Sequence, residues 1–480
     1  MLFNSFDFII FFVIVTSLYF ILPHRFRWAL MLVASCFFYM TFIPAYLLIL
    51  FLLIIIDYSC AILMEPKKGR VRKAYLIFSI ISTVCVLFLF KYFNFFNENL
   101  AGIAGIMGWN YSIEALSIIL PIGLSFHTFQ SLSYVIEVYR GKQSPERHFG
   151  IYSLYVMFYP QLVAGPIERP QNLLHQFYEH HAFDYGRVAD GLRLMFWGLF
   201  KKVVIADRLA AIVGQVYSAP GLYNGPSLIL ATVAFSFQVY CDFSGYSDIA
   251  IGSARVMGFK LMENFRKPFS AVSISEFWKR WHISLTTWFK DYIYYPMISS
   301  KITKARIYWA TLAIFLISGL WHGASWTFVL WGLLHGLYLV ASYISKEWRQ
   351  SAVSFFRLDR APRLHWFIRV MFTFTLVNFS FILFRAESLG DAWMIISRLF
   401  VDISSPVSGI ISEIGIPYLL SMAVFISFML LFDHPEGSGL AGRIYIKSWL
   451  MPVAVSTIAF IAFLVFGAFF QAENFIYFQF

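Results

Sequence analysis

Long stretches with almost no charged residue recur along the whole sequence, and they constrain the fold more than any other feature. Several run for about 17–22 residues, long enough for an α-helix to cross about 30 Å of hydrocarbon. Charged residues make up 13% of the 480-residue chain and hydrophobic residues 59%, whereas soluble domains carry roughly a quarter charged residues. A membrane β-barrel would instead show short segments of alternating hydrophobicity. The sequence therefore predicts an all-α, polytopic integral membrane protein.

Lysine and arginine gather in alternate loops of the sequence. Residues 67–73 contain Lys67, Lys68 and Arg70 and two further basic residues, whereas residues 97–117 contain neither lysine nor arginine. Basic loops of membrane proteins stay in the cytoplasm, so we expect the N-terminus and the C-terminus on the non-cytoplasmic face. The same rule accounts for the net charge of +11, so no nucleic-acid partner is expected.

We expect a single membrane domain over residues 1–480, in three parts. Residues 1–149 and 346–480 are predicted to form regular membrane spans, and the chain ends on an aromatic tag, FIYFQF. In residues 150–345, charges, prolines and glycines interrupt the apolar stretches. Irregular backbone at membrane depth is tolerated only against protein or a water-filled cavity. This core is therefore expected to hold re-entrant or interfacial helices and the functional residues.

The segment SGLWHGASW, residues 318–326, places a histidine between two apolar stretches. The stretch before it, residues 307–320, has about 14 residues and would span only about 21 Å as a helix, too short to cross. Basic residues before the first stretch and after the second predict a pair that enters the membrane and returns, with His322 inside it. A buried imidazole can act as a general base on a hydroxyl or thiol. A histidine that only packs between helices is the alternative.

Residues 275–296, SEFWKRWHISLTTWFKDYIYYP, mix basic and aromatic side chains. This composition predicts an amphipathic interfacial helix, with Ser275 as its N-cap. Lys279, Arg280 and His282 are its candidate functional residues. The alternative is a solvated anchoring helix without chemistry.

Charged residues interrupt two other central stretches. Asp242 and Asp248 lie in YCDFSGYSDIAIG, where carboxylates need partners or water. Lys201 and Lys202 lie in GLFKKVVIADR, where they could meet a phosphate-bearing donor. The alternatives are a hydrogen-bond network between helices for the carboxylates and interfacial snorkelling for the lysines.

Two further histidines and the four cysteines give weaker indications of function. His335, 13 residues after His322, could reach the same cavity, and His127 is expected to be a packing residue. The four cysteines lie in apolar stretches without CxxC spacing, so neither disulfides nor a metal site is expected. The sequence also lacks the motifs of nucleotide hydrolysis, zinc proteolysis and the serine-hydrolase elbow.

Taken together, these stretches resemble the membrane-bound O-acyltransferase family, and within it the bacterial branch of alginate and peptidoglycan O-acetyltransferase membrane subunits. The resemblance covers nearly the whole chain, and eight stretches occurring in this order are highly specific. They are LFNSFDFIIFF, LPIGLSFHTFQSLSYVIEVYRG, FYPQLVAGPIERP, GLFKKVVIADR, YCDFSGYSDIAIG, FWKRWHISLTTWFKDYIYYP, WHGASW and FIYFQF.

This resemblance implies a fold and three site residues. The fold is a ring of about 11–13 transmembrane or re-entrant helices around a tunnel, each spanning helix needing about 20 apolar residues. The catalytic histidine of the family corresponds to His322, and a second polar residue of the active site corresponds to His282. The terminal tag would place Tyr477 as a transient acyl acceptor. Trp321, in the same element as His322, joins the charged residues above as a candidate for substrate or donor binding.

The resemblance also implies the substrates and the location. The donor would be acetyl-CoA or an acyl-carrier thioester entering from the cytoplasm, with no bound cofactor and no metal. An extracytoplasmic SGNH or serine-esterase-like partner would pass the acetyl group to a polysaccharide, either an alginate-like exopolysaccharide or peptidoglycan. The protein would lie in the bacterial inner membrane, with membrane lipid and possible acyl-carrier protein as further partners.

The residues by themselves also allow two other classes of function. Polar residues within the membrane also suit a transporter or exporter of a glycan or lipid intermediate, although no repeated halves are visible. A non-catalytic scaffold of an envelope complex would make His322 and Tyr477 dispensable.

Overall fold

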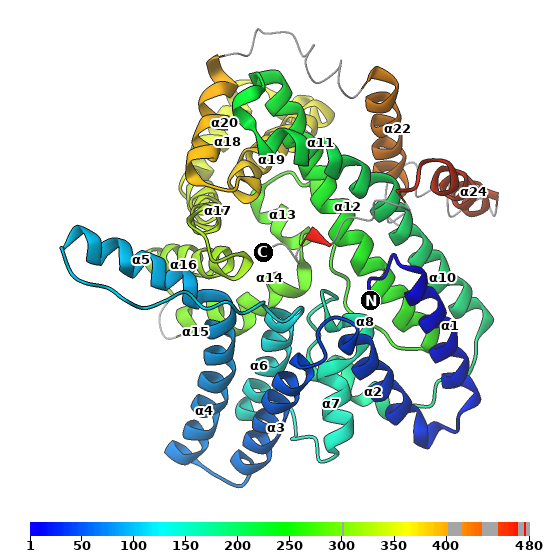
Figure 1. Cartoon of the computed structure of the whole chain (residues 1–480). Coiled ribbons are helices and arrows are strands. Elements are labelled where there is room, and N and C mark those ends of the chain that lie inside the picture. The colour runs from blue at the N-terminus through cyan, green and yellow to red at the C-terminus, as the bar shows by residue number, and fades with distance from the viewer. Residues whose placement is uncertain (300–301, 402–414, 434–449, 469–474, 477–480) are drawn as a thin grey trace. The chain divides into compact units, whose positions relative to one another are not determined.

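The computed structural model describes residues 1–299, 302–401, 415–433, 450–468 and 475–476. Within these ranges every regular element is a helix, and none is a strand (Figure 1). The chain divides into two compact units. The first contains Met1–Met195 and Ser247–Met262, and the second contains Phe196–Tyr246 and Glu263–Phe480. The predicted all-α class is confirmed, while the single membrane domain, the helix count and the ring around a tunnel stay predictions.

Five helices of the described chain are long and apolar enough to cross a membrane. They are Tyr46–Met64, Gly69–Ile106, Gly225–Met257, Trp326–Ile344 and Pro362–Arg385. Three shorter apolar helices cover Phe6–Ile21, Ile416–Phe432 and Val453–Phe466. Large apolar side chains such as Leu48, Ile55 and Phe78 are exposed on these helices. Such surfaces are stable in lipid because the helix satisfies its own backbone hydrogen bonds, and the chain is therefore a multi-pass membrane protein.

The first unit begins with hairpins of long helices and continues with short ones. Its elements are α1 (Phe6–Ile21), α2 (His24–Met40), α3 (Tyr46–Met64), α4 (Gly69–Leu87), the π-helix η1 (Phe88–Tyr92), α5 (Phe93–Ile106), α6 (Leu124–Arg140), α7 (Phe149–Met157), α8 (Tyr159–Leu162), α9 (Pro170–Leu173), the 3₁₀-helix η2 (Leu174–Tyr178) and most of α10 (Tyr185–Leu199). The end of α12 (Gly225–Met257) also belongs to this unit.

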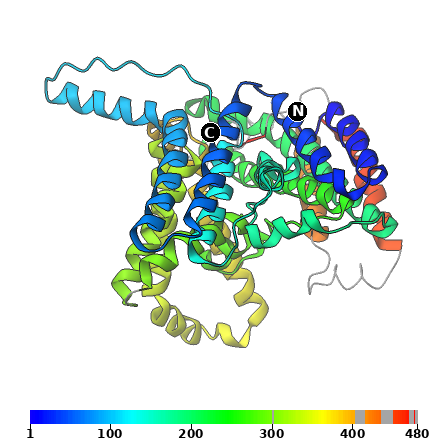
Figure 2. The same cartoon turned by 90° about the horizontal axis from the view of Figure 1, so that it is seen from below.

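A buried carboxylate joins three of these helices. Asp57 of α3 accepts hydrogen bonds from Ser79 and Thr83 of α4 and from Ser131 of α6. Figures 1 and 2 show α3, α4 and α6 lying side by side. Hydroxyl groups that bond across helices hold membrane bundles together where lipid offers no competing partner.

One loop of the first unit differs from its prediction. The expected non-helical segment 97–117 is helical as far as Ile106, because α4, η1 and α5 form one continuous helix. Asn94 and Asn97 of α5 bond the backbone of the returning segment at Leu116 and Ile113. These amide side chains satisfy the backbone of an extended segment that has no strand partner.

The second unit holds most of the sequence elements expected to carry function. Its elements are the end of α10, the π-helix η3 (Phe200–Ala206), α11 (Asp207–Ser218), the 3₁₀-helix η4 (Pro220–Leu222), the first two thirds of α12, the 3₁₀-helix η5 (Pro268–Ser270), α13 (Ile274–Arg280), α14 (Ile283–Phe289), the π-helix η6 (Lys290–Tyr294), α15 (Tyr295–Ile298), α16 (Lys304–His322), α17 (Trp326–Ile344), α18 (Lys346–Phe355), the 3₁₀-helix η7 (Leu358–Arg360), α19 (Pro362–Arg385), α20 (Leu389–Val401), α22 (Ile416–Phe432) and α24 (Leu450–Phe466).

Helices α16 and α17 form a hairpin whose backbones touch. A Cβ added to Gly319 would lie 2.3 Å from the carbonyl oxygen of Phe328, and one added to Gly332 would lie 2.2 Å from that of Phe315. Only glycine permits this approach. The predicted pair of stretches around His322 is thus present. However, α16 has 19 residues rather than the 14 apolar ones, so its length alone, about 28 Å, does not prevent crossing.

The segment 275–296 is not one helix as predicted. Helix α13 ends at Arg280, and α14 begins after His282, which has a φ of +45°. The loop before α13 causes this break, since Arg266 donates its N–H to the carbonyl of Arg280 and the carbonyl of Asn264 accepts from Ile283 N–H. The predicted N-cap is also wrong by two residues, because Ser273 is the residue whose hydroxyl accepts from Glu276 N–H.

Candidate active site

His322 is the last residue of α16, at the closed end of the α16–α17 hairpin. Its side chain is 3% exposed. The imidazole lies 5.0 Å from Trp321, 5.0 Å from Trp331 of α17 and 5.3 Å from Phe384 of α19, measured between ring centroids. Aromatic side chains on three helices therefore position the ring and surround it with a low-dielectric environment, in which hydrogen bonds and charges act strongly.

His282 is held by a side chain from a distant part of the sequence. Its Nδ1 lies 3.0 Å from Oδ1 of Asn264, which also accepts a hydrogen bond from Ser284 at 3.0 Å. Both His282 and Asn264 are buried. Because an amide oxygen can only accept, the proton of His282 lies on Nδ1, and Nε2 is the basic nitrogen. A fixed tautomer of this kind is what a general base needs.

Trp321 connects the two histidines. Its ring lies 6.1 Å from that of His282 and 5.0 Å from that of His322. The N-cap of α14 and the last residue of α16 thus bring two imidazoles, 40 positions apart in the sequence, to one indole. The structure therefore places together the two histidines and the tryptophan that the sequence singled out.

Phe475, close to the C-terminus, lies one aromatic ring away from His282. The ring of Phe243, on α12, is 4.6 Å from His282 and 5.7 Å from Phe475. Phe475 and Ile476 are both buried. Tyr477, the predicted acyl acceptor, lies outside the described residues, and its role stays a prediction.

Lys202 and Asp242 form an ion pair within the second unit. The Lys202 ammonium lies 2.7 Å from Asp242 Oδ1 and 2.7 Å from Asp207 Oδ1. Burial costs both charged groups their hydration, and the attraction between them repays that cost only when the geometry is good. Both distances here are short. Asp248, the other carboxylate predicted on α12, is buried in the first unit.

Lys201 is paired with a residue far along the chain. Its ammonium lies 3.4 Å from Asp433, which also accepts hydrogen bonds from Trp197 and Tyr240. Lys201 is 0% exposed. Each of the two lysines predicted to meet a donor phosphate is therefore held by a carboxylate, and their role in donor binding stays a prediction.

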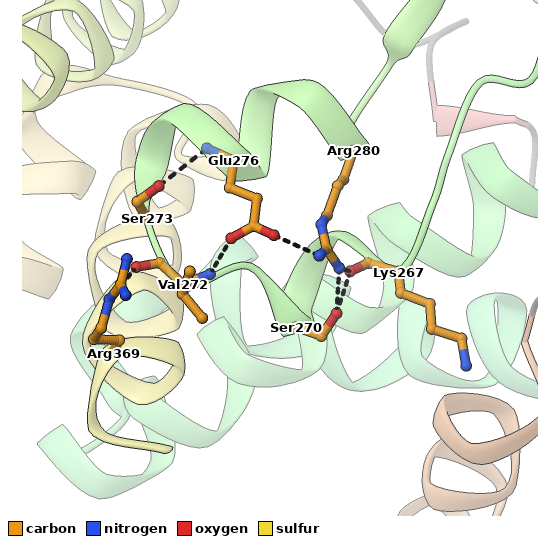
Figure 3. Close-up of polar contacts among 7 residues, drawn as sticks. All are labelled: Lys267, Ser270, Val272, Ser273, Glu276, Arg280 and Arg369. Atoms are coloured by element: carbon orange, nitrogen blue, oxygen red, sulfur yellow. Dashed lines mark hydrogen bonds and ion pairs between the residues drawn. The ribbon is translucent and has the colours of Figure 1, made fainter. Parts of the chain in front are cut away.

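Arg280, like the two lysines, is held by a carboxylate, and it is part of a separate hydrogen-bond network. Its guanidinium donates to Glu276, to Ser270 and to the carbonyl oxygen of Lys267 (Figure 3). Glu276 in turn accepts the backbone N–H of Val272 at 2.8 Å. The predicted donor-binding Arg280 thus fastens the loop before α13 to that helix.

Lys279 differs from its neighbour because it is exposed and has no ion pair among the described residues. Burial and then the like charge of Lys279 lower the pKa of the Lys290 ammonium at the end of α14. The carboxylate of Asp291 partly offsets this by raising the same pKa. Because it is exposed, Lys279 remains a candidate for donor binding.

His335 joins three helices through hydrogen bonds and lies 4.9 Å from Trp331, measured between ring centroids. The indole N–H of Trp278 donates to its Nδ1 at 3.3 Å, so its proton lies on Nε2, which is 2.9 Å from Ser380 Oγ. The imidazole is 0% exposed and joins α13, α17 and α19. Its hydrogen bonds explain why it is neutral and buried.

Sequence reasoning missed Asn264 and Asp433. Asn264 lies in the loop between α12 and η5, and no local pattern links it to a histidine 18 residues later. Asp433 follows an apolar helix, and a carboxylate at such a position needs a partner. That rule could have identified it. In the first unit, His127 is buried, and its ring nitrogens have no hydrogen-bond partner among the described residues.

The described chain is an all-α, multi-pass membrane protein whose second unit brings two buried imidazoles to one indole. Residues 148–384 match the model of MBOAT, the membrane-bound O-acyltransferase family. The chain belongs to this family, and it is an enzyme, an O-acyltransferase that uses an acyl donor. The transporter and scaffold interpretations are thereby set aside.

Three relatives are similar over most of the chain. A probable alginate O-acetylase of Azotobacter vinelandii is 36% identical over 386 residues, 80% of this chain and 74% of the relative. The probable alginate O-acetylase of Pseudomonas aeruginosa is 36% identical over 403 residues, 83% of this chain and 75% of the relative. A peptidoglycan O-acetyltransferase of Helicobacter pylori is 33% identical over 396 residues, which is 77% of this chain and 73% of the relative.

Proposed function

We propose that the protein moves an acetyl group from a cytoplasmic thioester, acetyl-CoA or an acyl-carrier thioester, toward the hydroxyl groups of an extracytoplasmic polysaccharide. The acceptor class and the acetyl group follow the relatives, which are named for the O-acetylation of alginate and of peptidoglycan. An SGNH or serine-esterase-like partner outside the membrane would complete the transfer. The location is the bacterial inner membrane, with both chain ends outside.

One observation carries this proposal. Trp321 contacts both His282 and His322, and Phe243 contacts both His282 and Phe475. Phe475 is therefore separated from His282 by one aromatic ring, and His282 is separated from His322 by another. A tail that only anchored the protein at the interface would need no such neighbours.

The reaction is proposed in two transfers. In the first, the Tyr477 oxygen attacks the thioester carbonyl carbon, the C–S bond breaks, and His322 takes the phenol proton and returns it to the departing thiolate. In the second, a polysaccharide hydroxyl attacks the aryl ester, and its proton restores the phenol of Tyr477. General-base assistance contributes about 10²–10⁴-fold.

The surroundings of the histidines suit this chemistry. Because Trp321, Trp331 and Phe384 enclose His322, water has little access to a thioester held there. Exclusion of water protects a reactive acyl group from hydrolysis. His282, with its basic Nε2 fixed by Asn264, would be the second polar group, taking up or returning a proton.

The test is the acetyl content of the extracytoplasmic polysaccharide in cells that carry His322→Ala in place of the natural protein. We expect a loss of on the order of 10²-fold or more in transfer rate, with normal insertion in the membrane. His335→Asn is the comparison variant, because it also changes a buried histidine of the hairpin, one whose ring nitrogens bond Trp278 and Ser380. Undiminished acetyl content in His322→Ala would rule the proposal out.

A further inference from the structure

The C-terminal segment is attached to the second unit by its backbone as well as by its side chains. The N–H of Ile476 donates to Asp242 Oδ2 at 2.7 Å. Phe475 packs 4.7 Å from Tyr246 and 5.7 Å from Phe243, measured between ring centroids. Phe475 and Ile476 are 2% and 3% exposed, so this contact is fully removed from solvent and lipid.

A second attachment precedes the first. Arg208 of α11 donates to the carbonyl oxygens of Phe466 and Gly467 at the end of α24. Ala468 donates its N–H to the carbonyl oxygen of Val203 at 3.2 Å. The chain is therefore held at residues 466–468 and again at 475–476, both times by the part of the unit formed by η3, α11 and α12.

Asp242 is itself fixed from the opposite side. Its Oδ1 lies 2.7 Å from the Lys202 ammonium, which is equally close to Asp207, while its Oδ2 faces the tail. Helix α12 approaches this lysine closely because residue 245 is glycine; a Cβ there would lie 2.7 Å from the carbonyl oxygen of Gly198. A hydrogen bond to a carboxylate that is held in place is stronger and more directional than one between neutral groups.

We propose that Asp242, oriented by Lys202, is a positioning residue that docks the C-terminal segment through the backbone N–H of Ile476. This inference rests on the proposed function, in which Tyr477, the next residue, carries the acyl group. It gives Lys202 and Asp242 a task different from binding the donor. Because Asp242 contacts the backbone, docking depends more on the backbone N–H of residue 476 than on its side chain.

The test compares Ile476→Pro, which removes the N–H, with Ile476→Val, which keeps the N–H and most of the apolar side chain. Purified full-length protein is treated with carboxypeptidase Y, and the loss of residues 480 to 477 is followed by intact mass, before the peptidase reaches position 476. We expect Ile476→Pro to be trimmed about tenfold faster than the natural protein, as for the loss of about 1.4 kcal/mol of docking. Ile476→Val should stay within about twofold.

A second pair of variants examines the other partner. Asp242→Asn keeps an oxygen that can accept the N–H and should leave trimming slow, whereas Asp242→Leu should speed it as Ile476→Pro does. Thermal unfolding of each variant shows whether it is folded. The proposal is overturned if Ile476→Pro has the same unfolding temperature as the natural protein and is trimmed at the same rate.

The same preparations separate this inference from the function on which it rests. After incubation with labelled acetyl-CoA, the terminal peptide is analysed for label. Faster trimming of Ile476→Pro with no label on the natural tail supports docking by Asp242 and contradicts the relay by Tyr477. A labelled natural tail with equal trimming and equal labelling of Ile476→Pro supports the relay and contradicts docking by Asp242.

Discussion

Asn264 Oδ1 accepts a hydrogen bond from His282 Nδ1 at 3.0 Å, and this contact fixes which nitrogen of His282 is basic. The two residues come from different segments, a loop and the N-cap of α14. The positive φ of His282 costs a non-glycine residue energy, and such conformations gather at functional sites. The contact is therefore best explained by a task for the imidazole.

Replacement of Asn264 by alanine should reduce acyl transfer by on the order of 10²-fold, because His282 loses the acceptor that sets its tautomer. Initial rates with labelled acetyl-CoA measure the effect. Ser284→Ala is the matched control, since Ser284 donates to the same oxygen but does not orient the ring. Equal losses in the two variants would show that Asn264 acts only on the fold.

His335→Ala should lower stability rather than chemistry. The substitution leaves the buried Trp278 N–H and Ser380 hydroxyl without their partner, at a cost of about 1–3 kcal/mol for each group. We expect a melting temperature lower by several degrees in detergent, with the rate per folded molecule nearly unchanged. A large fall in that rate with an unchanged melting temperature would instead make His335 part of the site.

Gly332→Ala should destabilise the α16–α17 hairpin by about 1–3 kcal/mol, as expected for overpacking. The added Cβ would lie 2.2 Å from the Phe315 carbonyl oxygen, so the helices must separate and His322 must shift. Gly214→Ala, where nothing lies within 4 Å of the added Cβ, is the control and should be neutral or slightly stabilising. Thermal unfolding of both variants measures the difference, and equal stability would contradict the close packing.

Lys279→Ala should raise the KM for the thioester donor several-fold, and more at low ionic strength, if the exposed ammonium attracts a phosphate group. The turnover number should change little. Lys346→Ala, another exposed lysine of the second unit, should leave the KM as it is. If the KM has the same salt dependence in Lys279→Ala as in the natural protein, Lys279 is not part of the donor site.

Local patterns in the sequence predicted the class of fold. Long uncharged stretches predict membrane helices because lipid offers no hydrogen bonds, and the described helices confirm this. The basic residues around residues 307–343 predicted the hairpin that carries His322. His322 could be selected as a candidate because a polar group within a membrane segment needs a partner or a function, whereas Trp321 was added through the family resemblance.

Long-range contacts decided what the sequence could not predict. The break at His282 depends on Asn264 and Arg266, whose backbones bond residues 283 and 280, and no helix propensity within residues 275–296 indicates it. The pairing of Lys201 with Asp433 joins residues 232 positions apart. Such partners follow from the packing of the whole unit, and a single sequence does not display them.

The most direct measurement is mass spectrometry of the C-terminal peptide of purified protein after incubation with isotopically labelled acetyl-CoA or an acyl-carrier thioester. We predict that label appears on Tyr477 of the natural protein, is absent from Tyr477→Phe and is lost from His322→Ala. Active transfer to an added acceptor by a natural protein whose tail never carries label, or full labelling of Tyr477 in His322→Ala, would contradict a relay driven by the buried imidazole.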